Sequence, residues 1–449
     1  MTNSTNPSEH LPQFSVEPIS SISDGLNKLP RPEFYNLFLN VETQLSNFLL
    51  YYTAPGGHTL LRSAIRSYER CLTGKRDSEC GEYANDICLT VGATSGIFYY
   101  FKYMRNKRAL FLGYHYMHFR VAAEENNVNY EVLVSRYPNR VAPTIDEVEE
   151  IISGFDFITV TLPFNPSGEM YSRGELERLL NLCVKNNIQI LIDKCQWDEI
   201  LLSKKQGYYS PGQAVLSQNA EKITTIIASF SKIRSIPGAR IGYAFGPHPI
   251  IEYMIYMNNL IMWHPGMLLL FPVIIDFIAQ LQYLSENMII QMEDNFYLKF
   301  RHHIMRSYQS KECIKYVLSC IAPKNIANYK SELLAQLDSN QAQIDLNYAY
   351  LTEQVKKLDI TVTHFGGGYN VFILYPNLRN YSESELKKRI KGYSDLCVLT
   401  QDDFCTSDAS TGPIWIRVTL ALEHEDFKNT LDLFLRALEN INEGKEYEY

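Results

Sequence analysis

Residues 223–240 read ITTIIASFSKIRSIPGAR, a stretch in which an apolar run gives way to hydroxyl groups, one lysine and one arginine. The first seven residues have the β-branched composition of a buried strand that ends near Ser229. Small hydroxyl residues, Lys232 and the planar donor fork of Arg240 then follow, a combination that suits a phosphate. Lysine and arginine also occur beside small residues on solvated surfaces. Whether this stretch is a surface or a binding site therefore has to be judged from the residues at the ends of the neighbouring strands.

The composition limits what kind of protein this is. The chain has 449 residues, of which 46% are hydrophobic and 20% charged, which is typical of a globular protein with more than one domain. The formal net charge of −8 argues against a nucleic-acid partner. Nine cysteines without a CxxC pair support neither a metal site nor a disulfide framework, and they predict a reducing, cytoplasmic location.

Two segments of the sequence, the N-terminus and the most apolar stretch, indicate whether to expect a targeting signal or a membrane span. The first fifteen residues are polar and have no apolar run, so we expect no signal peptide. The most apolar stretch, residues 251–281, is interrupted by charged residues and prolines, and it predicts buried or interface helices rather than a membrane span.

Short β-rich runs alternate with helical patterns between about residues 55 and 250. The runs are residues 87–91, 109–113, 130–134, 157–161, 188–193 and 223–229. Strands that alternate with helices predict an α/β fold, with a mostly parallel sheet between two layers of helices. After about residue 361 the pattern changes to that of a smaller α+β domain. We expect an N-terminal arm (1–50) that joins the small domain, a large domain (51–285), interdomain helices with an insertion (286–360) and the small domain (361–449).

Three further strand ends carry small or polar residues. VGATSG at 91–96 leads from a strand into a helix, where backbone amides can hold an anion. LPFNPSGEMYS at 162–172 offers the amide of Asn165, although Asn-Pro and Ser-Gly are also ordinary turn dipeptides. Asp193 ends the strand 188–193, where it can cap the next helix or stabilise a cationic ring nitrogen.

In this order the features resemble the fold-type-I pyridoxal-phosphate enzymes, in particular the class I/II aminotransferase-like superfamily. The resemblance is carried by Asn-Pro-Ser-Gly at 165–168, Asp193, Ser-Phe-Ser-Lys at 229–232 and Gly-Ala-Arg-Ile-Gly-Tyr at 238–243. YYTAPGGHTLLRSAIRSYER at 51–70 and IWIRVTLA at 414–421 are similar to further segments of that family. The resemblance runs from about residue 51 to the C-terminus, and it implies the aminotransferase fold with a seven-stranded type of sheet.

The resemblance implies pyridoxal 5'-phosphate as the cofactor and a role for each matched residue. Lys232 would form the Schiff base and move the proton at the substrate's Cα, and Asp193 would keep the ring nitrogen protonated. Arg417, with Asn165, would bind the substrate's carboxylate. The implied contacts to the cofactor ring come from Asn165, Tyr116 and Gln196. The implied contacts to the phosphate come from Ala93, Thr94, Ser229, Ser231 and Arg240, with Tyr52 reaching the partner subunit's phosphate across a homodimer interface.

The implied function is an enzyme that acts at the Cα of an L-amino acid through an external aldimine and a quinonoid, most simply an aminotransferase of amino-acid metabolism. Gln196 departs from the family, which commonly has a tyrosine there, and Trp197 after it is either core or pocket wall. This departure leaves elimination, replacement, cyclisation or an oxidase/hydroxylase reaction of specialised biosynthesis as the alternative. A non-catalytic regulator is disfavoured, since the chain has no added basic domain. An acidic residue of the arm, Glu17 or Asp24, would suit a cationic substrate.

Overall fold

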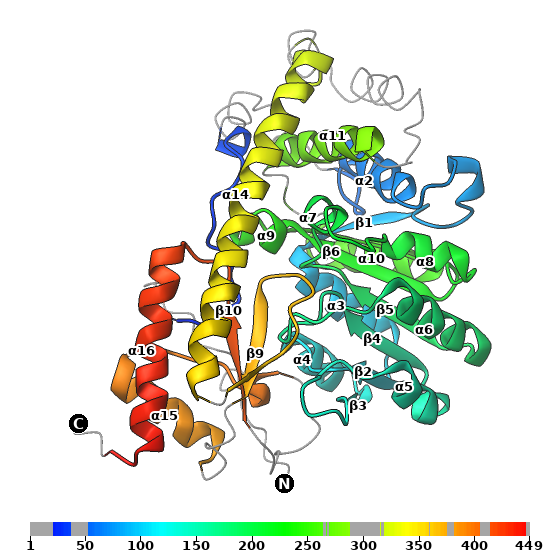
Figure 1. Cartoon of the computed structure of the whole chain (residues 1–449). Helices are drawn as coiled ribbons and strands as arrows, with labels where there is room; N and C mark the ends of the chain where they lie inside the picture. Colours follow the sequence, from blue (N-terminus) through cyan, green and yellow to red (C-terminus); the bar gives the residue numbers. More distant parts are fainter. Residues whose placement is uncertain are drawn as a thin grey trace.

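The computed structural model describes residues 21–36, 53–263, 266, 269–287, 315, 318–358, 360–374, 381–404 and 414–445. In these residues a large sheet between helices lies beside a small sheet with its own helices (Figure 1). Residues 1–20 of the expected arm, and residues 288–314 of the expected insertion, lie outside the described residues. No helix in the part of the chain that the structure describes is long and apolar enough to cross a membrane.

The large sheet has seven strands and is mostly parallel, as the sequence predicts. Its strands, in spatial order, are β1 (Ile87–Val91), β7 (Ile241–Phe245), β6 (Thr224–Ser229), β5 (Gln189–Asp193), β4 (Phe157–Thr161), β2 (Arg108–Leu112) and β3 (Asn129–Leu133). All pairs are parallel except those of β7, which runs antiparallel to both β1 and β6. β7 is the strand that the run of apolar patterns does not reveal; it has five residues, like β1 to β5, but contains Gly242, which weakens the strand pattern.

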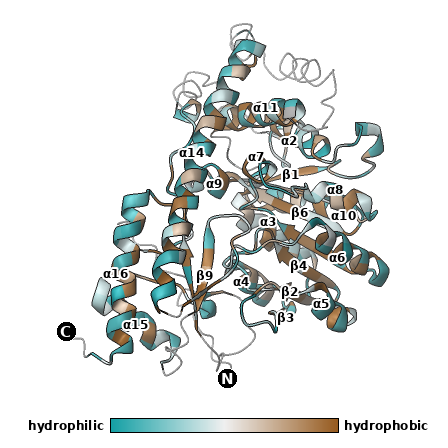
Figure 2. Ribbon diagram, in the orientation of Figure 1, coloured by the Kyte–Doolittle hydropathy of each residue, from teal (hydrophilic) through white to brown (hydrophobic). Residues whose placement is uncertain are grey.

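Helices cover both faces of the large sheet. On one face lie α3 (Gly92–Tyr103), α4 (His118–Glu125) and α10 (His248–Ile261). On the other face lie α2 (Thr59–Cys71), α5 (Ile145–Ile151), α6 (Arg173–Asn186), α8 (Pro211–Ser217) and α11 (Leu270–Asn287). Successive strand residues point to opposite faces, so Ile190 and Ile192 join one core while Leu191 joins the other. The central strands are accordingly mostly apolar, as Figure 2 shows.

Two helices of the large domain begin at a residue whose side chain caps the first turn. Thr144 caps α5 and Ser172 caps α6, each as a reciprocal capping box with a glutamate three residues later. Short elements complete the large sheet's surroundings: α7 (Glu199–Ser203), α9 (Phe230–Ile233), η3 (Asp77–Glu79), η4 (Ile152–Gly154) and η5 (Pro237–Ala239).

The small sheet is antiparallel, in the order β10 (Trp415–Thr419), β9 (Asn370–Leu374) and β8 (Thr361–Val362). α15 (Glu383–Ser394) and α16 (His424–Asn442) pack on it, and Ile22 and Leu29 of the N-terminal segment belong to the same core. The short helices η6 (Lys356–Leu358) and η8 (Gln401–Asp403) flank this sheet. α14 (Pro323–Val355) is long enough to pack against α11 at one end and α16 at the other, so it ties the two cores together (Figure 1).

Candidate active site

The candidate site lies where the carboxyl ends of β4, β5 and β6 meet the small sheet. Asp193 is the last residue of β5, and Lys232 lies in α9, directly after β6. Arg417 comes from β10 of the small sheet and reaches the loop after β4. Parallel strands bring their carboxyl ends to one edge, and this edge is where α/β sheets bind ligands.

Lys232 is held in the short turn of α9. Ser229 caps α9 by accepting a hydrogen bond from the backbone N–H of Ser231 at 3.2 Å. The carbonyl oxygen of Lys232 accepts a hydrogen bond from Asn27 Nδ2 at 2.9 Å, so the N-terminal segment supports the turn. Burial, and secondly the positive charge of Arg417, lower the pKa of Lys232 to about 8. A lysine with this pKa supplies a neutral, nucleophilic amine near neutral pH.

Asp193 is a buried carboxylic acid, 5% exposed. Its Oδ1 accepts a hydrogen bond from the backbone N–H of Cys195 at 2.9 Å. Burial raises its pKa. A cation placed beside this carboxylate would offset the cost of burying its charge, which is what a protonated ring nitrogen supplies.

Hydroxyl groups and Arg240 lie together where β6, β7 and α3 meet. Ser229 Oγ lies 2.9 Å from Ser231 Oγ. The fork of Arg240 donates to the carbonyl oxygens of Pro237 and Val91, at 3.1 and 3.3 Å. A Cβ added at Gly92 would lie 2.6 Å from Arg240 Nη2, so only glycine lets the arginine approach the start of α3. Ala93 and Thr94, the next two residues of α3, present their backbone amides at the same helix end.

Arg417 is buried, with 4% of its surface exposed, and hydrogen bonds fix the orientation of its guanidinium group. Nε donates to the carbonyl oxygen of Ser23 at 2.9 Å, and Nη1 donates to Asn165 Oδ1 at 3.3 Å. The ring of Phe404 lies under the guanidinium carbon at 5.0 Å. Burial lowers the pKa of Arg417 to about 10. A buried cation with no bidentate carboxylate partner in the described residues suits a substrate carboxylate.

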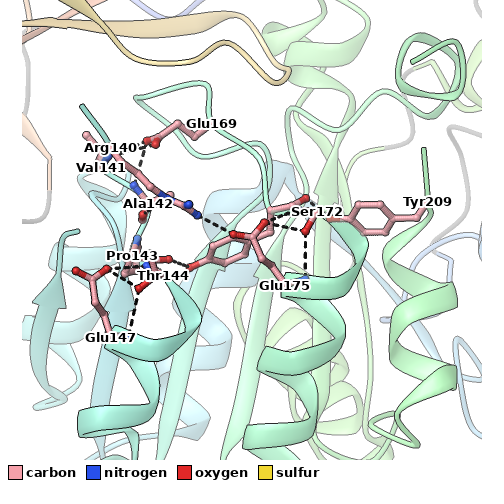
Figure 3. Close-up of polar contacts among 11 residues, drawn as sticks. Arg140, Val141, Ala142, Pro143, Thr144, Glu147, Glu169, Ser172, Glu175 and Tyr209 are labelled. Carbon is pink, nitrogen blue, oxygen red and sulfur yellow. Dashed lines mark hydrogen bonds and ion pairs between the residues drawn. The ribbon is translucent and has the colours of Figure 1, made fainter. Parts of the chain in front are cut away.

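The loop that carries Asn165 is anchored at both sides. Figure 3 shows Glu169, whose Oε2 accepts hydrogen bonds from the backbone N–H groups of Val141 and Ala142, both at 3.0 Å. Ser172 and Glu175 close the loop into α6, and Arg140 binds Glu175 at 2.9 Å. A Cβ at Gly168 would lie 2.1 Å from the carbonyl oxygen of Asn370, so this loop and β9 touch through backbone. The side-chain amide of Asn165 is thus fixed between the two sheets.

Tyr116, in the loop after β2, is partly buried and stacks on His118 with ring centroids 4.7 Å apart. Burial raises its pKa, and the positive charges of Arg417 and Arg240 oppose that effect. Gln196 Oε1 accepts from Tyr369 N at 3.3 Å and from Asn370 Nδ2 at 3.4 Å, which turns its carbonyl toward β9. Trp197 is buried in the core of the large sheet. Tyr52 lies outside the described residues.

Four residues of this site are not evident from the sequence pattern: Ser23, Gly25, Asn370 and Thr419. Thr419 Oγ1 joins two of them, since it donates to Asn370 Oδ1 at 3.0 Å and accepts from Gly25 N at 2.9 Å. Of these four, only Thr419 could have been predicted from the sequence, because it stands two residues after Arg417 and so lies on the same face of β10. The N-terminal segment carries no such periodicity.

Comparison with known proteins agrees with this geometry. The model of the family "Aminotransferase class I and II" matches residues 41–282, more than half of the chain. An aspartate aminotransferase of Bacillus sp. (strain YM-2) is 27% identical over 219 residues, or 45% of this chain and 50% of that protein. The aspartate aminotransferase of Bacillus subtilis (strain 168) is 35% identical over 97 residues, or 22% and 24% of the two chains. The chain therefore spans about half, or less, of the length of these curated relatives.

Two solved structures share the fold over nearly the whole chain. The aromatic aminotransferase from Pyrococcus horikoshii OT3 superposes with a TM-score of 0.69 at 14% identity, covering 97% of this chain and 99% of its own. The aspartate aminotransferase from Rhizobium meliloti gives a TM-score of 0.68 at 16% identity, covering 94% and 92%. Both likenesses concern the fold, and the family match concerns the sequence of the large sheet and its helices. The family match, over more than half of the chain, establishes that this chain belongs to the aminotransferase class I and II family.

Proposed function

We propose that this protein is a pyridoxal-phosphate-dependent aminotransferase that acts at the Cα of an L-amino acid. The observation that carries the proposal is the position of Lys232. Its amine, with a pKa lowered to about 8, lies at the same sheet edge as the buried acid Asp193 and within the electrostatic influence of Arg417. An activated amine, a buried acid and a carboxylate-binding arginine are the groups that amino-group transfer needs.

The donor set fits pyridoxal phosphate. The cradle at the start of α3, in which Gly92 leaves room for Arg240, would hold the phosphate together with Ser229 and Ser231. Asp193 would bind the ring nitrogen, and Asn165 and Gln196 are the amides for the ring oxygen. Tyr116 offers an aromatic face to the ring. When bound, this cofactor supplies an electron sink for the pair left at Cα after proton removal.

The residues of this chain have separate tasks in the proposed reaction. Arg417 binds the substrate's α-carboxylate, and Asn165 holds one end of its guanidinium group at 3.3 Å. Lys232 anchors the cofactor and then, as a free amine, moves the proton at the substrate's Cα. Asp193 stays ionised beside the ring nitrogen and keeps it protonated.

We further propose that the enzyme is a homodimer. Large apolar side chains are exposed at the end of α10 and just after it, at Tyr256, Leu260, Ile261 and Trp263. A contiguous apolar patch on a globular protein is commonly an interface. Light scattering of the purified protein tests this proposal, and a mass equal to one chain at micromolar concentration would contradict it.

The function is tested by trapping the cofactor and by following the reaction with single donors. Borohydride reduction and peptide mapping should place the cofactor mass on Lys232, and Lys232→Ala should abolish both labelling and turnover. A panel of amino acids with and without 2-oxo acids then defines the reaction. Turnover that needs no 2-oxo acid and releases water, ammonia or peroxide would instead support the elimination, cyclisation or oxidation alternative.

A further inference from the structure

The segment from Ser23 to Gly25 lies across the guanidinium group of Arg417. The carbonyl oxygen of Ser23 accepts from Arg417 Nε at 2.9 Å. A Cβ added at Gly25 would lie 2.8 Å from Arg417 Nη2, so the backbone touches the guanidinium plane. Asp24 stands between these two contacts, and its position is therefore set by the arginine that binds the substrate.

The same segment also reaches the lysine. Asn27, three residues beyond Asp24, donates its side-chain amide to the carbonyl oxygen of Lys232 at 2.9 Å. Burial lowers the pKa of both Lys232 and Arg417, and the negative charge of Asp24 opposes that effect at both groups. Asp24 therefore belongs to a segment whose neighbouring residues contact both Arg417 and the turn of Lys232.

The two other carboxylates near these cations have their own tasks. Asp193 is buried at the end of β5, where it is proposed to hold the ring nitrogen. Asp403 caps η8, accepting from Thr400 N at 2.7 Å, and it pairs with Lys387. Asp24 has no proposed contact with the cofactor, and among the described residues its carboxylate binds two groups of its own segment, the backbone N–H of Leu26 and the side chain of Lys28.

The carboxylate of Asp24 is accessible to a ligand. Oδ1 accepts from the backbone N–H of Leu26 at 3.0 Å, and Oδ2 pairs with Lys28 Nζ at 2.6 Å. The side chains of Asp24 and Lys28 are 23% and 40% exposed. A solvent-exposed pair of this kind contributes about 1 kcal/mol or less, so a substrate cation can compete with Lys28 for the carboxylate.

We propose that Asp24 determines substrate specificity, so that the site prefers an L-amino acid with a cationic side chain, an ammonium or a guanidinium group, over the dicarboxylic amino acids. This inference rests on the proposed function. With the α-carboxylate on Arg417, a cationic side chain forms a charge-assisted contact with Asp24, and a second carboxylate is repelled by it.

The test compares the wild-type holoenzyme with two variants. Each is given a single amino-acid donor, and the half-reaction is monitored through the absorbance of the cofactor. The donors are arginine, ornithine and lysine, the neutral norleucine and glutamine, and the acidic aspartate and glutamate. Asp24→Asn should lower kcat/KM for the cationic donors about tenfold, mainly through KM, and change norleucine less than about threefold. For aspartate, kcat/KM should rise in this variant, because the charge that repels its second carboxylate is removed. Lys28→Gln is the matched control, which removes the pair but keeps the carboxylate, and it should retain the preference for cations.

Three outcomes would overturn the proposal. In the first, Asp24→Asn slows all donors alike, which shows a structural role for Asp24. In the second, the wild type prefers aspartate or glutamate, in which case the aminotransferase function stands and the inference fails. In the third, Lys28→Gln reproduces Asp24→Asn. If no donor changes the absorbance at all, the proposed function itself fails. Calorimetric binding of α-methylornithine to wild type and Asp24→Asn gives a second readout that does not need turnover.

Discussion

Replacing Arg234 by methionine tests how the turn that carries Lys232 is held in place. α9 has four residues, too few for a helix that is stable alone. Arg234 follows it, and its fully buried guanidinium group binds both oxygens of Asp276 in α11, at 2.6 and 3.1 Å. It also donates to Asp198, the N-cap of α7, and Tyr35 donates to Asp276 at 3.0 Å. Four segments of the chain therefore meet at one cation.

The magnitude follows from burial. The side chains of Asp198 and Asp276 are 3% and 0% exposed, so Arg234→Met leaves two carboxylates in the core that pair with no other cation among the described residues. Removing one partner of a buried ion pair costs about 3–5 kcal/mol, a hundredfold or more in the ratio of folded to unfolded protein. Urea unfolding should show the loss, followed by fluorescence and circular dichroism together to check that the transitions coincide.

Two further variants make this prediction specific. Adding Asp276→Asn to Arg234→Met should recover part of the lost stability, because it removes one of the stranded charges. Arg178→Met is the control, since Arg178 pairs with Asp146 and Glu149 at the surface and should cost about 1 kcal/mol or less. The reasoning is refuted if Arg234→Met and Arg178→Met unfold at the same urea concentration, or if the double variant is less stable than Arg234→Met.

Three more predictions concern the site and its surroundings. At Gly25, with φ of +64°, an added Cβ would lie within 2.9 Å of three guanidinium atoms of Arg417. Gly25→Ala should therefore raise KM for amino-acid donors about tenfold in steady-state kinetics, whereas Gly81→Ala, with φ of +53° and open space, should only lower stability by about 1 kcal/mol. Because burial lowers the pKa of Lys232 to about 8, Schiff-base formation by the apo protein should rise with pH and be half-maximal near pH 8 in stopped-flow absorbance; a midpoint above pH 10 would contradict this. Burial raises the pKa of Glu199 from 4.5 to about 7, so the folded state keeps a proton that the unfolded state loses. The free energy of unfolding, measured in urea, should therefore fall as the pH rises from 4.5 to about 7. Glu199→Gln should make this pH dependence weaker, and a variant with the same pH dependence as the wild type would contradict the prediction.

Most of the large sheet and the centre of the candidate site can be predicted from the sequence, because their signals are local. Apolar runs of five or six residues mark buried strands, and the residue that ends each run is placed at the sheet edge by the fold class itself. Lys232 and Asp193 are found in this way, each within a few residues of a strand that the sequence predicts. The capping boxes of Ser172 and Thr144 are local too, since the bonds join residues three apart.

The contacts between site residues that lie far apart in the chain depend on the tertiary structure. Arg417 meets Ser23 across 394 positions and Asn165 across 252, and nothing in either segment's periodicity encodes such a contact. The same holds for the buried pair of Lys194 and Glu69, joined at 2.6 Å although both residues look like surface charges in the sequence. The antiparallel place of β7 between β1 and β6 is likewise a matter of packing. The sequence alone predicts the strands of the large sheet other than β7, their ends and the candidate lysine, because hydrophobic periodicity and capping act over a few residues. The closing of the small sheet onto that edge, which aims Arg417 and places Asp24, depends on side chains far apart in the chain that meet only after both cores have packed.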